Sequence, residues 1–334
     1  MKKLLMISTD PKILQEGSAV RARQVEYAKE WDEVHIIIFG TSPGESVIAP
    51  NCWAYPTNVS SKFMNPFAAM RLGRFLIEKR GIAHITCQDP FLTSMAGVAL
   101  KKQFQHVNLE VQVHTDIGSP NFAYTLGNKV RKSLALSYLP KADHIRVVSN
   151  KIRDFLVEKL MIDSAKIEVR PIVVDTQKIK DAPIIQGADL RTKFPQFEKI
   201  VLMASRLEKE KNIESAIKAW AKVVQRMPRA GLVIVGSGSE KSGLIAHTSK
   251  LNLSNMVVFE EWIDCDVLYS YYKTSDLFLN TSLFEGYGMT LVEAHAAGCK
   301  IVSTDVGVAR EVGAEIVPFG DIDTLADVIV KNLK

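Results

Sequence analysis

The chain has 334 residues, a formal net charge of +5 at pH 7 and 47% hydrophobic residues, which is the composition of an ordinary globular protein. This length predicts two domains, and either half of the chain can bury a core. The four cysteines form no C-x-x-C pair, which argues against a disulfide framework or a zinc site and favours a reducing cytoplasm. Because no stretch of about 18 apolar residues occurs, we expect no membrane-spanning helix.

Charge is distributed unevenly along the chain. Residues 1–180 carry 25 Lys and Arg against 17 Asp and Glu, a net of +8, and the remainder carries 17 against 20, a net of −3. A basic first half suits an anionic surface or acceptor, although solvated lysine faces are the commoner cause of so small an excess. We expect no nucleic-acid partner.

The first half alternates strand and helix patterns. Residues 3–9 predict a buried strand, residues 21–31 a helix and residues 34–39 the next strand, which is a unit of a parallel sheet. Gly17 lies in the loop before that helix. Further strands are predicted at residues 84–90, 109–114 and 142–149. Ligands of open parallel sheets collect beyond the carboxyl ends of strands, so His114 is a candidate site residue, although a lone histidine is more often structural.

Residues 67–80 predict a helix in which Phe67 and Phe75 alternate with basic residues such as Arg71 and Arg74. Basic amphipathic helices can lie on membranes. The commoner arrangement is a helix packed on a sheet with its basic face in water. A peripheral membrane contact of the first domain therefore stays open at this point.

The polar segment at residues 176–195 contains prolines and is the expected linker. The predicted domains therefore span residues 1–178 and residues 196–334. Two Asp-x-Asp strings occur in the second domain, and such pairs hold a metal in some enzymes. Both precede predicted helices, where aspartate is a routine cap, so we expect no metal site at Asp264, Asp266, Asp321 and Asp323.

The second domain opens with two strand-to-loop transitions. A strand at residues 200–204 leads into a charged loop that contains Arg206 and Lys211, and a strand at residues 232–235 enters a turn at Gly236. The simplest interpretation of the first loop is a solvated surface segment. Gly236-x-Gly238 alone is only a weak signal for a dinucleotide site.

The most informative stretch is Thr281 to Gly298. Glu285 precedes Gly286-Tyr287-Gly288, a helix is expected from about Thr290, and Glu293 lies about one turn inside it. Glycines let a backbone approach a ligand closely, and a helix start suits phosphate. The two carboxylates would repel that phosphate unless each binds hydroxyls on either side of it, which describes a nucleoside diphosphate sugar. The alternative is two solvated carboxylates on the surface.

Glu285-x7-Glu293, within Ser-Leu-Phe-Glu-Gly-Tyr-Gly-Met-Thr-Leu-Val-Glu-Ala, resembles the donor-site signature of the family 4 retaining glycosyltransferases. The segment from Ala297 to Gly307 and then Glu311 also follow that pattern. The family usually has Gly where this chain has Val308 and Pro where it has Lys300. The resemblance runs over most of the chain and is strongest in its second half.

The resemblance implies an α/β chain of GT-B architecture, with two Rossmann-like domains whose parallel sheets face each other across a cleft. The first domain would bind the acceptor and the second the donor. The activity would be transfer of a hexose from a UDP- or GDP-sugar to a hydroxyl, with retention of the anomeric configuration. The acceptor would be a carbohydrate or a lipid-linked molecule. No cofactor or metal is expected, and the location would be the cytoplasm, with peripheral contact at the inner membrane face left open.

The same resemblance assigns roles to individual residues. Arg206 and Lys211 would hold the donor diphosphate. Glu285 would contact the hexose and Glu293 the ribose. The acceptor side would include Arg21 and His114, and the histidine would lie near the reacting sugar. The other positions implied on the donor side are Gly286, Tyr287, Gly288, Met289, Thr290, Gly236 and Gly17.

Two other functions remain open from the sequence. A sugar-nucleotide epimerase of the same architecture is disfavoured because the two-glutamate loop and the Arg206–Lys211 pair occur together. A non-catalytic nucleotide-sugar-binding subunit is kept open by two departures. Only Gly17 and Ser18 stand where the family usually has a Gly-Gly loop, and the chain stops before the last helical turns usual in the family. That early end leads us to expect a looser hinge between the domains.

Overall fold

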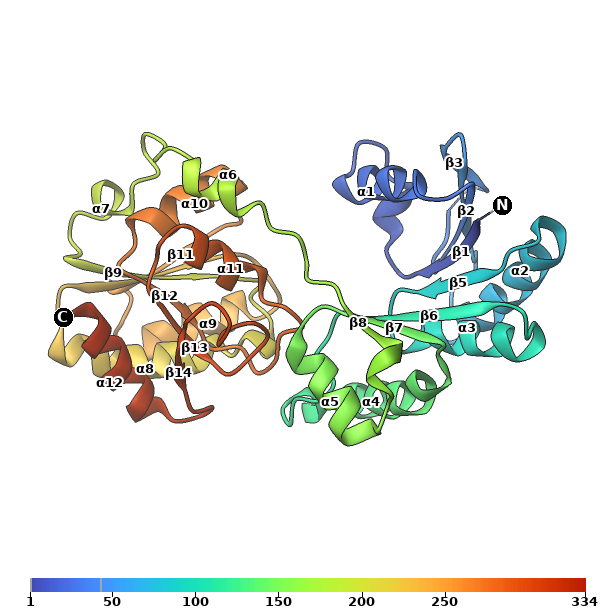
Figure 1. Ribbon diagram of the computed structural model, residues 1–334. Helices are drawn as coiled ribbons and strands as arrows, with labels where there is room; N and C mark the ends of the chain where they lie inside the picture. Colours follow the sequence, from blue (N-terminus) through green and yellow to red (C-terminus); the bar gives the residue numbers. More distant parts are fainter. Residues whose placement is uncertain (1, 43) are drawn as a thin grey trace. The chain divides into compact units, whose positions relative to one another are not determined.

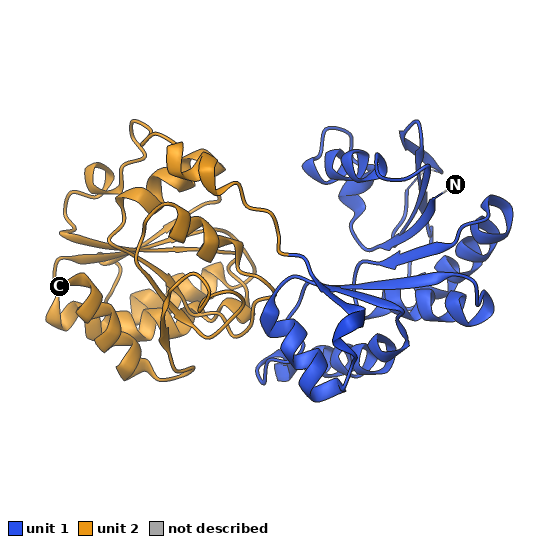
Figure 2. Ribbon diagram, viewed as in Figure 1, with its two compact units in different colours: residues 1–170 blue, residues 171–334 orange. Residues whose placement is uncertain are grey.

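A computed structural model describes residues 2–42 and 44–334 of the chain. The chain divides into two compact units, residues 1–170 and residues 171–334 (Figure 2). The division falls after Arg170, earlier than the boundary at residue 178 that composition predicts. Each unit has its own sheet.

Unit 1 is built on an eight-stranded sheet of order β3-β4-β2-β1-β5-β6-β7-β8, parallel except for the β3–β4 pair (Figure 1). Its strands are β1 (Lys3–Ser8), β2 (Glu33–Ile38), β3 (Ser46–Ala49), β4 (Cys52–Pro56), β5 (His84–Cys87), β6 (Asn108–Val113), β7 (His144–Val147) and β8 (Ile167–Val169). Its α-helices are α1 (Ala19–Ala28), α2 (Asn65–Arg80), α3 (Leu92–Gln103), α4 (Leu126–Tyr138) and α5 (Asn150–Leu160). Helices α2 and α3 pack on one face through Gly73 and Gly97, and α1 covers the other face at Leu4 and Met6.

Unit 2 is built on a six-stranded parallel sheet of order β11-β10-β9-β12-β13-β14 (Figure 1). Its strands are β9 (Lys199–Ala204), β10 (Ala230–Val235), β11 (Val257–Glu260), β12 (Leu277–Asn280), β13 (Ile301–Thr304) and β14 (Glu315–Val317). Its α-helices are α6 (Thr176–Asp181), α7 (Leu190–Lys193), α8 (Ile213–Arg226), α9 (Lys241–Lys250), α10 (Cys265–Thr274), α11 (Met289–Ala296) and α12 (Ile322–Leu333). Fully buried Trp220 anchors the core on one face, and Tyr271 and Tyr272 anchor it on the other.

The order of strands reverses at β9, since the chain continues to β10 on one side and returns as β12 on the other. In open parallel sheets, the carboxyl ends of the strands at such a reversal form a ligand site. The loops after Ala204 and after Asn280 leave the sheet at this position. The fold of unit 2 therefore directs attention to these two loops.

The segment expected to be a linker is folded onto unit 2. The amide of Ile185 donates to Ser270 Oγ at 3.0 Å, and the amide of Leu190 donates to Thr274 Oγ1 at 3.1 Å. Both acceptors lie on α10. Residues 176–195 therefore belong to the second unit, because helix α10 satisfies their backbone.

Most helix ends follow the sequence. Gly298 follows α11 with φ +80, and Ser149 caps α5 through its hydroxyl, which are the residue types that favour these positions. Asp321 Oδ1 accepts from the amide of Thr324 at 3.0 Å, which confirms the cap at α12. The expected cap at α10 is wrong in detail, because Asp264 occupies the cap position without a side-chain hydrogen bond.

The second residue of each Asp-x-Asp string is held by a lysine. Asp266 lies 3.2 Å from Lys178 Nζ, and Asp323 pairs with Lys222. Both are ion pairs between well-exposed side chains.

The architecture confirms the predicted class, an α/β chain with two Rossmann-like domains built on parallel sheets. Within residues 2–42 and 44–334, every helix is too short or too polar to cross a bilayer.

Candidate functional site

The loop after β9 and the loop after β12 are joined by backbone contacts. The amide of Leu283 donates to Glu210 O at 2.7 Å. Thr281 Oγ1 donates to the carbonyls of Lys211 and Asn212, at 3.1 and 3.0 Å. Because the carbonyls of a short 3-10 turn (Lys209–Lys211) are held in this way, the position of Lys211 relative to the second loop is fixed.

Lys211 and Glu285 form an ion pair at the junction of these loops. Lys211 Nζ lies 2.6 Å from Glu285 Oε1, and the two side chains are only 12% and 17% exposed. Ser282 Oγ donates to the same carboxylate at 2.8 Å. The structure thus brings together two residues that the sequence assigned to different parts of the donor. Our sequence-based view of Lys211 as part of an exposed loop is wrong for its side chain.

Arg206 lies in the same loop and is much more open to solvent. Its guanidinium is 2.9 Å from Glu210 Oε1, and its side chain is 67% exposed. The turn after β10 supports this loop, since the amide of Leu207 donates to Ser237 O at 2.9 Å. A Cβ at Gly236 would lie 1.9 Å from Ser205 O. We therefore explain Gly236 by close backbone packing, while its expected donor contact stays a prediction.

The start of α11 is preceded by Gly286, Tyr287 and Gly288. Gly288 has φ +92 and caps the helix without a side chain, so the first amides of α11 receive no capping oxygen. Met289 is exposed and Thr290 is half-buried. Backbone N–H groups at such a helix start favour an anion.

The backbone at Gly307 and Val308 packs against the glycine loop, residues 286–288. The amide of Val308 donates to Tyr287 O at 2.9 Å, and a Cβ at Gly307 would lie only 2.1 Å from that oxygen. Val308 itself is buried, with 3% of its surface exposed. The valine at position 308, where the family usually has glycine, therefore fits inside unit 2.

Glu293 lies one turn inside α11 and faces α10. The hydroxyl of Tyr272, which is fully buried, donates to Glu293 Oε2 at 3.0 Å. Burial raises the pKa of Glu293, and the tyrosine hydrogen bond opposes that shift. The sequence gives no sign of Tyr272, because the two residues meet only when α10 and α11 pack together.

A small cavity adjoins the ion pair at the ends of β9 and β12. Its lining comprises Met203, Ala204, Ser205, Lys211, Phe278, Leu279, Asn280, Glu285 and Thr290. Asn280 Oδ1 accepts from Ser282 Oγ at 2.7 Å and from the amide of Ser282 at 3.0 Å. Asn280 Nδ2 is buried and has no hydrogen-bond partner within the described part of the chain. Asn280 and Ser282 are site residues that the sequence analysis missed, although Ser282 lies inside the motif.

In unit 1, the side chains near the start of α1 make hydrogen bonds to backbone atoms of the same unit. Gly17 has φ +75, and Ser18 caps the helix by accepting from the amide of Arg21 at 3.0 Å. The guanidinium of Arg21 donates to Val47 O at 2.9 Å and to Leu14 O at 3.4 Å. Arg21 therefore ties α1 to its surroundings, and its acceptor role remains a prediction.

His114 follows β6 directly. Its Nε2 lies 3.1 Å from Gln112 Oε1. Burial, followed by the nearby charge of Arg146, lowers the pKa of His114 to about 4, so the ring is neutral at pH 7. A neutral imidazole can accept as well as donate a hydrogen bond, which suits contact with a hydroxyl.

No metal centre is evident in this part of the chain. Among residues 2–42 and 44–334, no group of three or more His, Cys, Asp and Glu side chains could hold a metal ion. Lys211 and Glu285 are charged residues in the lining of the small cavity, and Arg206 lies in the same loop as Lys211.

An α/β protein of two Rossmann-like units, with a candidate anion site at one edge of the second sheet, is the class that this fold and site define. The model described as "Glycosyltransferase Family 4" matches residues 25–178, and the one described as "Glycosyl transferases group 1" matches residues 190–334. Together they match most of the chain. The chain therefore belongs to the group 1, family 4 glycosyltransferases of GT-B fold.

Sequence relatives agree with this placement. An uncharacterized glycosyltransferase of Methanocaldococcus jannaschii is 27% identical over 75% of this chain and 64% of that protein. The N-acetylgalactosamine-N,N'-diacetylbacillosaminyl-diphospho-undecaprenol 4-alpha-N-acetylgalactosaminyltransferase of Campylobacter jejuni is 27% identical over 82% of this chain and 73% of that protein. The chain thus spans less than two thirds of the archaeal relative, and it spans 40% of the alpha-monoglucosyldiacylglycerol synthase of Streptococcus pneumoniae.

Solved structures show the same fold. Sucrose-phosphate synthase from Thermosynechococcus elongatus superposes with a TM-score of 0.78 at 20% identity, over 99% of this chain and 89% of that one. The alpha,alpha-trehalose-phosphate synthase of Burkholderia vietnamiensis gives 0.74 at 14% identity, over 99% of this chain and 92% of that one.

Proposed function

We propose that the protein transfers a hexose from a UDP- or GDP-sugar to a hydroxyl of a carbohydrate or lipid-linked acceptor, with retention of the anomeric configuration. The observation that carries the proposal is the Lys211–Glu285 ion pair beside the glycine-bounded start of α11. A cation, a carboxylate and helix N–H groups at one edge of a sheet suit a ligand that has both phosphates and hydroxyls.

The donor would lie along this edge with its diphosphate near the start of α11. Arg206, Lys211 and the amides around Gly286–Gly288 would stabilise the charge that develops on the departing diphosphate. This is work that a metal ion does in other enzymes. Glu293 would accept hydrogen bonds from the ribose hydroxyls.

Glu285 would bind hydroxyls of the hexose. Its carboxylate is already engaged by Lys211 and Ser282, which favours a hydrogen-bonding role over nucleophilic attack. No enzyme nucleophile is then needed if the acceptor hydroxyl attacks from the face that the diphosphate leaves. His114, with Gly17 and Arg21, would lie on the acceptor side.

The acceptor class is supported by the names of several relatives. The Campylobacter relative is named for a diphospho-undecaprenol acceptor, and another relative from Escherichia coli is a UDP-Gal:alpha-D-GlcNAc-diphosphoundecaprenol alpha-1,3-galactosyltransferase. A phosphatidyl-myo-inositol mannosyltransferase of Mycolicibacterium smegmatis is 29% identical over 56% of this chain. A lipid-linked acceptor is therefore our first choice.

The test begins with a thermal-shift screen of nucleotide-sugars, in which a ligand at a hundred times its dissociation constant should stabilise by about 2.7 kcal/mol. The donor that shifts the protein is then incubated with lipid-linked acceptors in EDTA, and release of nucleoside diphosphate is measured. NMR of the product reads its anomeric configuration. An inverted product, or activity lost in EDTA and restored by manganese, would contradict the corresponding part of the proposal.

The same assay separates the other functions. A non-catalytic subunit would show the thermal shift without release of nucleoside diphosphate for any acceptor. An epimerase would convert the sugar without an acceptor. The Glu285→Gln variant is the reference for background release in each case.

We also propose a peripheral membrane contact through α2 and the residues just before it. The side chains of Phe63, Met64 and Phe67 are 79%, 51% and 51% exposed, and Phe75 is 57% exposed. Arg71 and Arg74 lie on the same helix, and with Met70, Ala99, Leu100 and Gln103 they line a groove against α3. Exposed aromatic residues beside arginines suit an anionic lipid surface.

Sedimentation with lipid vesicles tests this contact. The protein should co-sediment with vesicles that contain an anionic lipid, and less with neutral ones. The double variant Phe63→Ser/Phe67→Ser should abolish sedimentation. Met161→Ser is the matched control, since Met161 is an apolar residue in unit 1 that is 83% exposed far from α2 in sequence. Equal binding of all three proteins would count against the contact.

A further inference from the structure

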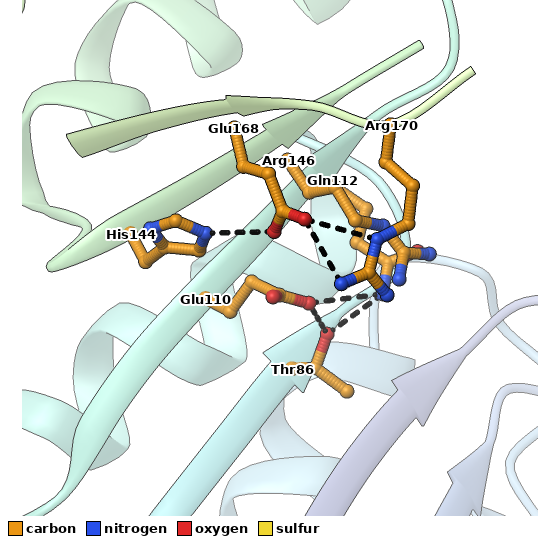
Figure 3. Close-up of polar contacts among 7 residues, drawn as sticks. All are labelled: Thr86, Glu110, Gln112, His144, Arg146, Glu168 and Arg170. Carbon is orange, nitrogen blue, oxygen red and sulfur yellow. Dashed lines mark hydrogen bonds and ion pairs between the residues drawn. The ribbon is translucent and has the colours of Figure 1, made fainter. Parts of the chain in front are cut away.

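Strands β5 to β8 carry a hydrogen-bonded polar network on one face of the unit 1 sheet (Figure 3). Alternate residues of β6 and β7, such as Val111 and Ile145, are fully buried on the apolar face. On the polar face, Gln112 is only 2% exposed and Thr86 only 1%. A buried amide with several polar neighbours has its orientation set by them.

The neighbours of Gln112 determine which way its amide points. Gln112 Nε2 donates to Thr86 Oγ1 at 2.9 Å and to Glu110 Oε1 at 3.1 Å. Thr86 Oγ1 donates its own proton to Glu110 Oε1 at 2.7 Å. On the other side, Arg146 Nη2 donates to Gln112 Oε1 at 2.6 Å.

The reversed amide would be unfavourable at both ends. It would place the oxygen of Gln112 against the carboxylate of Glu110 and its NH2 group against the guanidinium of Arg146. A carboxylate only accepts hydrogen bonds and a guanidinium only donates them, so both contacts would become repulsive. Gln112 Oε1 is therefore the atom that faces His114.

This orientation decides which ring nitrogen of His114 carries the proton. His114 Nε2 lies 3.1 Å from Gln112 Oε1, which accepts only, so Nε2 must be the N–H nitrogen. Among the described residues nothing hydrogen-bonds to Nδ1 of the ring. In a neutral imidazole, Nδ1 then holds a lone pair that can accept a hydrogen bond.

The charge state follows from the groups around the ring. The side chain of His114 is exposed on one side, and desolvation of the ring against the sheet is the main effect that disfavours the imidazolium. Arg146 on β7 adds to this effect, and Glu110 on β6 opposes it. From α1, Tyr27 also faces this pair of charges and stays neutral, because burial and Glu110 raise its pKa. On the same face, Glu168 binds His144 and Arg170, and Arg170 also interacts electrostatically with Glu110.

We propose that Gln112 and Arg146 are positioning residues that hold His114 as the neutral Nε2–H tautomer, so that Nδ1 accepts a hydrogen bond from a substrate hydroxyl. The role toward substrate rests on the proposed function, whereas the tautomer does not. A hydroxyl whose proton points at Nδ1 has its oxygen lone pairs directed away from the enzyme and available for attack.

The tautomer is measured without substrate. In protein labelled with ¹⁵N-histidine, two-bond ¹H–¹⁵N correlation spectra distinguish the two ring nitrogens, and a His114→Gln variant assigns the signals among the seven histidines. We expect Nε2 to be protonated, Nδ1 to be bare, and the ring to stay neutral from pH 8 down to pH 5. A proton on Nδ1, or ordinary titration near pH 6.5, would overturn the proposal whatever the reaction is.

Variants separate positioning from simple structural support. Arg146→Leu should move the titration of His114 up by about one pH unit or more, because a like charge is removed. Arg146→Lys should restore the wild-type titration. His144→Gln is the matched control on the same sheet face, and it should leave His114 unchanged. An unmoved titration in a folded Arg146→Leu protein would overturn the assignment of Arg146.

Once a donor and an acceptor are known, kinetics provide an independent check. Arg146→Leu should move the acid limb of the pH profile of kcat up by the same one pH unit or more, while the KM for the donor stays unchanged. If the spectra show the expected tautomer and the protein transfers no sugar, then the proposed function fails and the positioning network stands.

Discussion

At the scale of single residues, Lys211 and Arg206 differ in their exposure and in the carboxylate that each one contacts. Lys211 is held by Glu285 in a pair with little exposure, whereas Arg206 is mostly exposed and contacts Glu210. We expect Lys211→Ala and Arg206→Ala each to lower turnover by roughly 10² to 10³, the usual loss for an electrostatic donor to the transition state. Only Lys211→Ala should also lower the melting temperature, because it leaves Glu285 without its cation.

Turnover and thermal melts of the two purified variants make this comparison. Lys209→Ala is the control, since that lysine lies in the same short turn and has no assigned role. Wild-type turnover in both variants would remove the diphosphate assignment. Equal melting temperatures would mean that the Lys211–Glu285 pair contributes nothing to stability.

Glu293 gives a pH dependence to nucleotide binding. Burial raises the pKa of its carboxyl group, so the protonated form persists to higher pH than in water. Ribose hydroxyls donate stronger hydrogen bonds to the ionised carboxylate than to the protonated acid, which keeps only part of its acceptor capacity. Binding of a nucleoside diphosphate should therefore weaken as the pH falls through the raised pKa, and in that range binding should release a proton.

Calorimetry in buffers of different ionisation enthalpy counts that proton. Glu293→Gln should bind more weakly, by about 1 to 3 kcal/mol for hydroxyls left without a charged acceptor, and should lose the enzyme-linked proton release. The ligand's own phosphate titration appears equally in both proteins, so their difference isolates Glu293. An unchanged affinity in the variant would place the ribose elsewhere.

The sequence could predict the residues of the donor motif but not their contacts. Glu285, Glu293, Arg206 and Lys211 stand out by type and spacing, and all four lie in the loops and helix at one edge of unit 2. Their roles toward a donor stay predictions. Partners such as Tyr272 come from another helix and carry no local signal, because hydrogen bonds between distant segments leave no periodic pattern in the chain.

At the scale of elements, the backbone at Gly307 sets the position of the glycine loop that precedes α11. We expect Gly307→Ala to weaken nucleoside diphosphate binding, because its Cβ would displace the carbonyl of Tyr287 and shift the amides that follow. Gly313→Ala is the matched control: its φ of +72 imposes similar strain, but nothing lies within 4 Å of the added Cβ. Both variants should lose about 1 to 2 kcal/mol of stability from the left-handed backbone.

Binding by calorimetry and unfolding in denaturant separate the two effects. A Gly307→Ala protein that binds as tightly as Gly313→Ala would mean that the loop tolerates displacement, and that its amides do not contact the phosphates.

Hydrophobic runs in the sequence predicted the central strands well. Composition alone was less successful for the segment that joins the two units. The runs at residues 3–9, 34–39 and 200–204 became β1, β2 and β9 with shifts of one residue at most. The short strands β3, at the sheet edge, and β4, beside it, were not anticipated, since four or five residues give too little pattern. The segment 176–195 looks like a linker because its polar side chains face water, while its backbone is satisfied by α10.

At the scale of the whole molecule, the two units have separate cores. The buried clusters of unit 2 contain only residues from 188 onward. We expect a protein consisting of residues 171–334 to fold alone and to bind the nucleoside diphosphate with nearly the affinity of the full chain, without sugar transfer. Circular dichroism and calorimetry check this. A fragment that folds but does not bind would mean that unit 1 supplies donor contacts.

The position of the segment that connects the two units determines where a protease should first cut the native protein. Because residues 176–195 are hydrogen-bonded to α10, the covalent link between the units shortens to the extended stretch from Pro171 to Asp175. Val173 in that stretch is 92% exposed. Elastase, which cuts after small apolar residues, should therefore nick the native protein first at Val173 or Val174 and release two compact halves. Trypsin should not separate them there, since Arg170 is followed by proline and the lysines beyond lie in α6.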